Sequence, residues 1–304
     1  MKGLVLRSTG SWYEVVTESQ HHYSCRAKGK LRLDGSKETN PIAVGDWVEF
    51  EEEGENGVIS EILQRKNHML RQSVKKTGHS QVLAANVDQV LLLATIKQPR
   101  TSLGFIDRFL VSAESFRIPQ VLIFNKKDLL TPDERDEQEA LLTLYNRIHV
   151  QSLSLSAISD TLSFLDEILK NKVTLLAGHS GVGKSTLLNR LSPGILQAVG
   201  TISDFSNKGI HTTTFAEMFH LAENTYIIDT PGVKEWGLVD MDQQEISDYF
   251  PEMRELRLNC KFGSRCLHLQ EPKCAILAAV QLGEIAKSRY ESYLSMVMGG
   301  DNRK

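Results

Sequence analysis

The sequence has no apolar run long enough to cross a membrane. Its longest apolar stretches, residues 90–94 and 173–177, are far shorter than the roughly 20 residues that a spanning helix needs. The N-terminus lacks the charged and then apolar pattern of a secretory signal, and internal repeats and low-complexity segments are absent. We therefore expect a globular protein of the cytoplasm, without a membrane partner.

Cysteine is scarce, with four residues in 304, and the chain has no excess of positive charge, since its formal net charge is −3. The first shortage excludes a disulfide-dense scaffold, and the second excludes a whole-protein attraction to nucleic acid. Hydrophobic residues make up 41% and charged residues 24%, as in ordinary globular proteins. The length predicts two or three domains, and we expect a monomer.

Positive charge is concentrated in two patches within the first 80 residues. The first consists of Arg26, Lys28, Lys30, Arg32 and Lys37, and the second of Arg65, Lys66, Arg71, Lys75 and Lys76, with His68 and His79 nearby. Any contact with RNA must come from such local patches. A solvated loop explains each patch equally well when it is taken alone.

Residues 1–75 have the pattern of about five short strands separated by turn residues. The expected strands are 4–7, 12–17, 23–27, 47–50 and 58–62. This pattern predicts a small closed barrel, and the OB-fold is the common five-stranded version that binds oligonucleotides. An SH3-like barrel would give the same pattern.

From residue 76 to 236, buried strands alternate with amphipathic helices, which predicts an α/β domain with a parallel sheet. The strand candidates are 87–95, 120–124, 152–155, 173–177 and 225–229. One helix begins clearly, because Thr131 can cap it, Pro132 takes the first helical position and Glu134 completes a capping box. Helical patterns at 243–257 and 283–298 then predict a third, helical domain over 237–304.

The segment from residue 178 to 185 fits the Gly-x-x-x-x-Gly-Lys-Ser/Thr phosphate loop, and it lies between a buried strand and a helix, as that motif requires. Its backbone amides are expected to surround the phosphates, with Lys184 neutralising their oxygens and Ser185 binding Mg²⁺. The predicted nucleotide contacts are Gly178, His179, Ser180, Gly181, Val182, Gly183, Lys184, Ser185 and Thr186.

Four residues after the strand 120–124 resemble the Asn-Lys-x-Asp motif of GTPases; they are Asn125, Lys126, Lys127 and Asp128. By that resemblance, the Asp128 carboxylate accepts hydrogen bonds from guanine N1 and N2, which adenine does not offer. Lys126 then covers the base and Asn125 braces the loop. Ser156 and Ala157, after the next strand, resemble the second base-recognition element, whose backbone amide meets guanine O6.

Two further segments resemble the magnesium and switch elements of GTPases. Asp229 and Gly232 fit the Asp-x-x-Gly element, in which the aspartate holds Mg²⁺ and the glycine amide senses the γ-phosphate. Residues 209–214 resemble the first switch, and among its three threonines we favour Thr213 as a magnesium ligand. The predicted magnesium site therefore consists of Ser185, Thr213 and Asp229.

The order of these elements departs from that of ordinary GTPases, because base recognition precedes the phosphate loop. The sequence therefore predicts a circular permutation, which preserves the packed sheet while moving the chain ends. The second switch then leads directly into the C-terminal domain. We hypothesise that this connection transmits nucleotide state to that domain.

Val233 occupies the position where many GTPases place a water-orienting glutamine, so slow intrinsic hydrolysis is expected. His211, beside the first switch, is the internal candidate for a catalytic group, together with Thr213 and Lys184. A solvent-facing loop histidine explains His211 equally well.

A cluster of three cysteines and one histidine lies within fifteen positions of the C-terminal segment: Cys260, Cys266, His268 and Cys274. These residue types suit one tetrahedral zinc ion, against the alternatives of buried free thiols or a disulfide. Four protein ligands leave no open position, so the zinc is expected to be structural. Cys25 is expected to be a small buried hydrophobe.

The barrel, the permuted core, Val233 and the spacing of the Cys₃His cluster together resemble the bacterial small-ribosomal-subunit-dependent GTPase family, RsgA. The resemblance covers almost the whole chain. It implies binding of the 30S subunit and its 16S rRNA, late maturation of that subunit, and GTP hydrolysis stimulated by it. It also implies that nucleotide state is coupled to rRNA binding and release. In this chain, Ile210 replaces a basic residue that the family usually has in its first switch.

Other functions fit the residues less well. A GTP-binding scaffold that scarcely hydrolyses is favoured by Val233, and turnover measurements separate it from a GTPase. A phosphate-loop kinase predicts ATP and a small-molecule acceptor, which the guanine motif at 125–128 argues against. An RNA-binding zinc protein does not explain four nucleotide elements.

Overall fold

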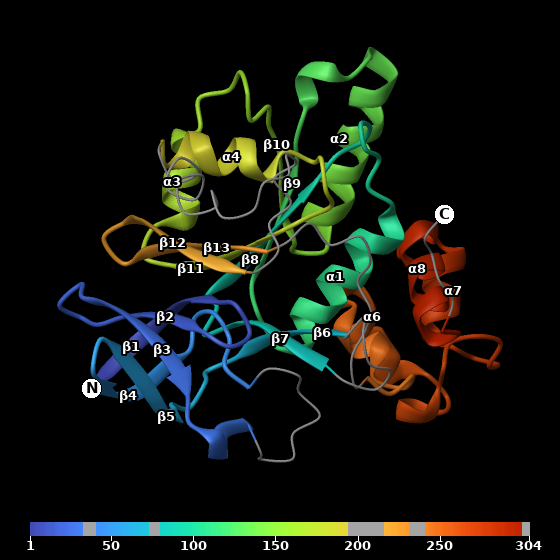
Figure 1. Cartoon of the computed structure of the whole chain (residues 1–304). Helices are drawn as coiled ribbons and strands as arrows, with labels where there is room; N and C mark the ends of the chain where they lie inside the picture. The colour runs from blue at the N-terminus through green and yellow to red at the C-terminus, as the bar shows by residue number, and fades with distance from the viewer. Residues whose placement is uncertain (33–40, 73–79, 194–215, 231–240, 300–304) are drawn as a thin grey trace.

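The computed structural model describes residues 1–32, 41–72, 80–193, 216–230 and 241–299 of the chain. In Figure 1 an N-terminal barrel lies below an α/β layer, and the C-terminal helices pack beside that layer. The confirmed fold class is thus a five-stranded barrel, an α/β core and a C-terminal segment that carries the Cys₃His cluster. The domain limits 1–75, 76–236 and 237–304 stay a prediction. No helix in the described ranges is long and apolar enough to span a membrane.

The N-terminal barrel has five strands in the order β1-β2-β3-β5-β4, and pairing of β1 with β4 closes it. Their bounds are Lys2–Ser8, Tyr13–Val16, His22–Ala27, Trp47–Glu53 and Asn56–Ile62. All pairs are antiparallel except β3 with β5, the order of an OB-like barrel. Cys25 is fully buried in the barrel core, as expected, and a Cβ on Gly57 would lie 2.5 Å from its Sγ. A short 3-10 helix, η1 (Gly29–Arg32), follows β3.

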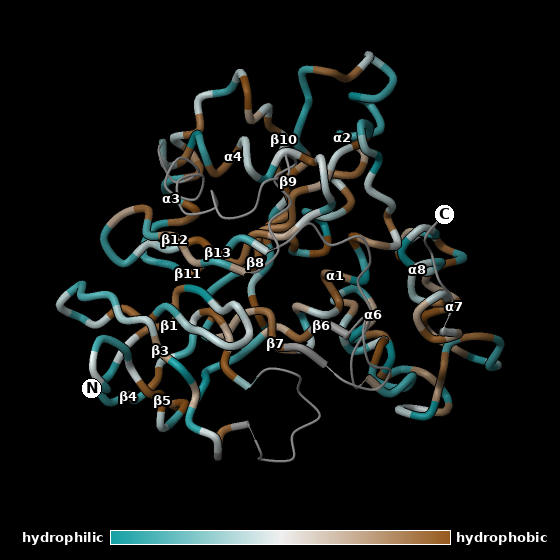
Figure 2. Tube along the Cα trace, viewed as in Figure 1, coloured by the Kyte–Doolittle hydropathy of each residue, from teal (hydrophilic) through white to brown (hydrophobic). Residues whose placement is uncertain are grey.

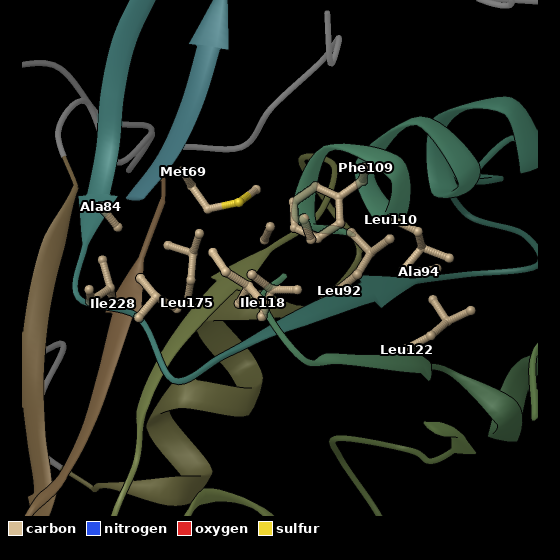
Figure 3. Close-up of a cluster of buried hydrophobic side chains, with 14 of the residues drawn as sticks. Met69, Ala84, Leu92, Ala94, Phe109, Leu110, Ile118, Leu122, Leu175 and Ile228 are labelled. Carbon is tan, nitrogen blue, oxygen red and sulfur yellow. The ribbon is translucent and has the colours of Figure 1, made fainter. Parts of the chain in front are cut away.

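A two-stranded hairpin, β6 (His68–Gln72) and β7 (Ser80–Ala85), links the barrel to the α/β core. Met69 and Ala84 from the hairpin share one apolar cluster with Phe109 and Leu92 of the core (Figure 3). The hairpin is therefore part of the same packed interior as the α/β sheet.

The α/β core contains six strands in the order β10-β9-β8-β11-β13-β12. In chain order, β8 to β13 are Gln89–Ala94, Gln120–Phe124, Gln151–Ser154, Val173–Ala177, Glu217–Ala222 and Thr225–Asp229. Five strands are parallel, which confirms the expected sheet, and only β12 runs antiparallel, beside β13. One residue pair, Arg7 with Glu217, joins this sheet to the barrel. Figure 2 shows these central strands as largely hydrophobic.

Helices cover both faces of the sheet (Figure 1). α1 (Leu103–Ser115) and α2 (Pro132–Arg147) contribute to one buried cluster, whereas α3 (Ser163–Leu169) and α4 (Lys184–Leu191) contribute to the other. The predicted capping box at the start of α2 is confirmed. The Glu134 amide donates to Thr131 Oγ1, and the Thr131 amide donates to Glu134 Oε2 at 2.8 Å.

The C-terminal segment is a set of short helices around the Cys₃His cluster. They are η3 (Ile246–Tyr249), α6 (Pro251–Arg254), η4 (Leu256–Asn259), η5 (Gly263–Arg265), α7 (Ala275–Gln281) and α8 (Lys287–Val297). The helical pattern at 243–257 forms three short turns rather than one helix, because Pro251 cannot donate the hydrogen bond of a helix interior. α8 packs against α1 of the core.

Candidate nucleotide site and Cys₃His cluster

The predicted nucleotide elements meet at one edge of the sheet. The phosphate loop (residues 178–185) follows β11, the Asn125–Asp128 motif follows β9, the segment 156–160 follows β10, and Asp229 ends β13. These strands are parallel neighbours, so their carboxyl ends lie together, where open α/β sheets bind ligands. Segments far apart in sequence thus face one site.

The phosphate loop has the curled backbone that the glycine spacing predicts. Gly183 has a φ of +104°, in the left-handed region, and a Cβ there would lie 2.3 Å from Asn125 Nδ2. Glycine is therefore required at this position for both conformation and space. Directly after it, α4 begins at Lys184 and presents its N-terminus to the loop.

Lys184 is buried, and its Nζ donates to the carbonyl oxygens of Gly178 at 2.9 Å and His179 at 3.3 Å. Burial lowers the pKa of its ammonium, while the negative charge of Asp229 opposes that shift. The side chains of Ser180, Ser185 and Thr186 are exposed at the same loop. A cation held by carbonyl oxygens beside accessible hydroxyls fits a polyphosphate site.

Asn125 joins the base-recognition motif to the phosphate loop. Its side chain is buried, Nδ2 donates to Val182 O at 2.8 Å, and Oδ1 accepts from the Ala157 amide at 2.8 Å. One amide side chain therefore holds three of the predicted elements together.

The next two residues are also engaged. Lys126, with a φ of +65°, donates to the carbonyl oxygens of Gly181, at 2.7 Å, and Gln98. Lys127 pairs with Asp160 at 2.7 Å. Asp128 belongs to a short 3-10 turn, η2 (Lys127–Leu129), and is exposed, and within the described ranges no residue pairs with its carboxylate. This carboxylate is available to a ligand.

The magnesium elements are described only in part. Asp229 is buried at the end of β13, and next to it Thr230 Oγ1 donates to Leu176 O at 2.9 Å. Ser185 begins the same helix as Lys184. Thr213, His211 and Gly232 lie outside the described residues, as does Val233.

The loop between β8 and α1 also reaches the phosphate loop, which the motifs did not predict. Gln98 accepts from Lys126, and Pro99 lies against Gly181, where a Cβ would be 3.4 Å from its Cδ. Phe105, at the start of α1, packs on the His179 ring with 3.9 Å between centroids. The only sequence signal was its position at the carboxyl end of a buried strand.

Cys260, Cys266, His268 and Cys274 form one buried cluster, and their ligand atoms all lie within 4.8 Å of one another. His268 Nδ1 is 3.3 Å from Cys274 Sγ and 3.6 Å from Cys260 Sγ. Burial raises the pKa of the Cys266 thiol to about 12 and lowers that of His268 to about 4. A divalent cation among them stabilises the thiolates and uses the neutral imidazole, so the donor set fits zinc.

Residues outside the cluster fix its geometry, and these the sequence did not reveal. Ser247 Oγ is 3.3 Å from His268 Nε2, which leaves Nδ1 for the cluster. The Tyr290 hydroxyl donates to His268 O at 2.7 Å. Glu271 accepts from the amides of Leu267 and Leu269, each at 2.7 Å. The loop that carries the ligands is therefore held by its own hydrogen bonds.

The described cations of the second basic patch are already paired. Arg65 donates from Nε and Nη2 to the buried Asp46 carboxylate, at 2.7 and 2.8 Å. Lys66 pairs with Asp88. In the first patch, Arg26 lies over the Trp12 ring at 4.0 Å. The side chains of Lys30, Arg32, Lys37, Arg71, Lys75, Lys76 and His79 lie outside the description.

Comparison with known proteins gave a consistent set of matches. The profile of the RsgA GTPase domain matches residues 62–239, and that of the RsgA N-terminal domain matches residues 2–59. "Small ribosomal subunit biogenesis GTPase RsgA" of Bacteroides fragilis is 48% identical over 300 residues, which cover 98% of this chain and 96% of the relative. The protein of the same name from Flavobacterium johnsoniae is 47% identical over 306 residues, or 99% of this chain and 94% of the relative.

Two solved structures have the same architecture. YjeQ from Thermotoga maritima aligns with a TM-score of 0.76 and 34% identity, covering 98% of this chain and 97% of that one. YloQ, described as a circularly permuted GTPase, aligns with a TM-score of 0.73 and 30% identity, covering 100% and 96%. The permuted order of the motifs is therefore shared with a solved structure.

Proposed function

The chain belongs to the RsgA family of GTPases, and we propose that it binds the small ribosomal subunit and assists its late maturation. Its activity is the hydrolysis of GTP to GDP and phosphate. The observation that carries the assignment is Asn125, which connects the guanine motif to the phosphate loop and to segment 156–160 through two 2.8 Å hydrogen bonds. These three segments are therefore already held together where GTP is proposed to bind.

The proposed nucleotide contacts follow the described geometry. Asp128, exposed and available, accepts from guanine N1 and N2, and Lys126 covers the base. The segment Gly178–Thr186 surrounds the phosphates. Lys184 exchanges its two carbonyl acceptors for β- and γ-phosphate oxygens. Asp229 and Gly232 at the phosphates, and the loop that begins with Ser156 and Ala157 at the base, are proposed to complete the set, although Gly232 lies outside the described residues.

Magnesium is proposed to lie beside the phosphates, held by Ser185, Asp229 and Thr213. Ser185 is exposed next to Lys184, and Asp229 is close enough for its charge to affect the Lys184 ammonium. When bound, the ion neutralises charge on the transferred phosphoryl group.

Hydrolysis is proposed to be slow in the isolated protein. Val233 has no polar group to orient the attacking water. His211 is the proposed group for that task, beside Thr213 and Lys184 at the phosphates, and binding to the small subunit is proposed to position it. Stimulation then comes from positioning rather than from a new catalytic residue.

The Cys₃His cluster is proposed to hold one structural zinc ion. Four protein donors converge, so no coordination position is left for a substrate. The ligands lie in and between short helices, and a zinc ion is proposed to hold these segments together.

The proposed RNA partner is 16S rRNA, contacted in part through the barrel. Arg26 stacked on Trp12 presents charge and an aromatic face together on its surface. The pairing of Arg65 and Lys66 within the protein argues that these two cations serve the fold instead. Because the proposed partner is the ribosomal subunit, the protein is proposed to act in the cytoplasm.

The deciding experiment is steady-state hydrolysis of GTP and ATP by the purified protein, alone and with isolated 30S or 50S subunits at physiological salt. Strong stimulation of GTP hydrolysis by 30S alone is expected. If neither subunit changes the rate, the ribosomal partner is wrong and another activator must exist.

Nucleotide state is proposed to reach the zinc-containing tail and so to control release from rRNA. The second switch is connected to the tail by residues 231–240, and α1 also packs on α8. Amide exchange of α8 should differ between the GDP complex and the complex with a non-hydrolysable GTP analogue. Identical protection in the two complexes would contradict the coupling.

A further inference from the structure

Arg190, near the end of α4, holds the base-recognition loop (residues 156–160) by three carbonyl oxygens. Nη1 donates to Ala157 O at 3.1 Å and to Ile158 O at 2.5 Å, and Nη2 donates to Asp160 O at 2.9 Å. The guanidinium is a rigid planar fork, so three such bonds fix the position of a whole loop.

The same helix begins at the phosphate loop. α4 spans Lys184–Leu191, with Lys184 holding the phosphate loop at its first residue and Arg190 holding the base-recognition loop one turn and a half further on. One helix therefore sets the spacing between the two ends of the nucleotide site. Sequence motifs do not predict this role, because residue 190 lies outside the phosphate-loop pattern.

Hydrogen bonds within the protein already occupy two amides of this loop. The Ser156 amide donates to Asp160 Oδ2 at 2.9 Å, and the Ala157 amide donates to Asn125 Oδ1 at 2.8 Å. Asp160 is itself paired with Lys127, which lowers the pKa of its carboxyl group. Neither amide is free to meet a base.

The Ile158 amide is different. It donates to no acceptor in the part of the chain that the structure describes, and its residue is 73% exposed. In a trans peptide the carbonyl and the N–H point in opposite directions. Because Arg190 binds the carbonyl oxygen of Ala157, the following N–H, that of Ile158, points away from α4.

We propose that Arg190 is a positioning residue for guanine recognition, which holds the Ala157–Ile158 peptide so that the Ile158 amide donates to guanine O6. The inference rests on the proposed guanine site, in which Asp128, on the neighbouring loop, accepts hydrogen bonds from guanine N1 and N2. It moves the O6 contact from the expected Ser156–Ala157 pair to the next residue. The Lys127–Asp160 pair fixes the far end of the same loop.

The test compares the dissociation constants of GDP and 6-thioguanosine diphosphate. The analogue keeps the N1 and N2 donors that Asp128 reads but replaces O6 with sulfur, a weak acceptor. The native protein should prefer GDP by about tenfold, the equivalent of one hydrogen bond. Arg190→Ala should weaken GDP binding by about tenfold and leave the analogue nearly unchanged, so that the preference disappears.

If Arg190→Ala fails to fold, Arg190→Lys tests the proposal instead. Lysine keeps the positive charge but lacks the planar guanidinium that binds three carbonyl oxygens. The Arg190→Lys variant should lose part of the preference for GDP over 6-thioguanosine diphosphate. Asn189→Ala, an exposed neighbour on the same helix, is the matched control and should retain the preference.

An equal loss of affinity for both nucleotides would mean that Arg190 has only a structural role, and an unchanged preference would also overturn the proposal. So would a native protein that binds both nucleotides equally. Absence of GDP binding in the native protein would instead refute the proposed function itself.

Discussion

Asn125 Nδ2 donates a 2.8 Å hydrogen bond to Val182 O, although the two residues are 57 positions apart. The contact joins the proposed base-recognition segment to the proposed phosphate loop. In the permuted chain these segments occur in reverse order, and the contact shows that they nevertheless pack together. The position of the chain ends, which the permutation moves, is thus independent of how these segments pack.

Replacing this side chain should disconnect the site. Asn125→Ala leaves the Val182 carbonyl and the Ala157 amide without their partner in a buried position. Such a loss costs about 1–3 kcal/mol per group, so GDP affinity should fall by roughly 30-fold or more. Fluorescence titration with a labelled GDP measures the effect, and affinity within twofold of the native value would contradict it.

Gly183→Ala should abolish tight nucleotide binding. The new Cβ would lie 2.3 Å from Asn125 Nδ2, at a φ of +104° that alanine rarely adopts. Gly10→Ala is a matched control, because its φ is +87° but nothing lies within 4 Å. The control should lose about 1 kcal/mol of stability and keep its affinity for GDP, whereas Gly183→Ala should lose roughly 100-fold in affinity. Equal affinities of the two variants would show that steric contact with Asn125 is unimportant.

Asp128→Asn should change base preference. Asparagine has an acceptor oxygen and a donor nitrogen where aspartate has two acceptor oxygens, whereas guanine N1 and N2 both donate. GDP binding should weaken by roughly 100-fold, and xanthosine diphosphate, whose position 2 carries an acceptor, should bind better than to the native protein. Asp133→Asn, at the exposed start of α2, should change neither affinity. Retained GDP preference in Asp128→Asn would place base recognition elsewhere.

The sequence predicted those parts of the fold that depend on local pattern. The phosphate loop lies between β11 and α4 as expected, and the capping box at Thr131 and Glu134 is present. The strand expected at 12–17 is found at 13–16. Such patterns predict structure correctly because each depends on a few neighbouring residues that fit few other local conformations.

Other parts of the fold and the site depend on tertiary contacts, which a local sequence pattern does not contain. β12 lacks alternation and β-branched residues, and it is a strand because it pairs with β13. In the sequence Arg65 belongs to a basic patch, but in the structure its guanidinium pairs with Asp46, 19 residues away. Arg190 gives no signal in sequence because its acceptors are backbone carbonyls, which every residue has.

Loss of the metal should unfold the tail. Native protein should contain one zinc per chain, and Cys274→Ser should contain little, because the sulfur that lies 3.3 Å from His268 Nδ1 is gone. Cys25→Ser, in the barrel, changes a cysteine far from the cluster and should keep its zinc. Metal analysis of the purified variants measures zinc, and circular dichroism measures helix loss. Full zinc content in Cys274→Ser would contradict the assignment.

Arg289 should be the most sensitive residue outside the nucleotide site. It is 1% exposed on α8, and it donates to Asp107 of α1 at 2.6 Å and to Glu252 of α6 at 2.7 Å. Arg289→Met leaves the carboxylates of Asp107 and Glu252 without their cation, and Asp107 is the more deeply buried of the two, so the loss should be about 3–5 kcal/mol. Urea denaturation should show that loss, whereas Lys287→Met, an exposed cation on the same helix, should change stability by less than about 1 kcal/mol.

The double variant tests the cause of that loss. Asp107→Leu combined with Arg289→Met removes the more deeply buried of the two unpaired carboxylates, so it should be more stable than Arg289→Met alone. If the double variant is less stable instead, the buried charge is not what destabilises the single variant, and lost packing of the arginine against Phe250, 4.5 Å from its ring centre, explains the effect.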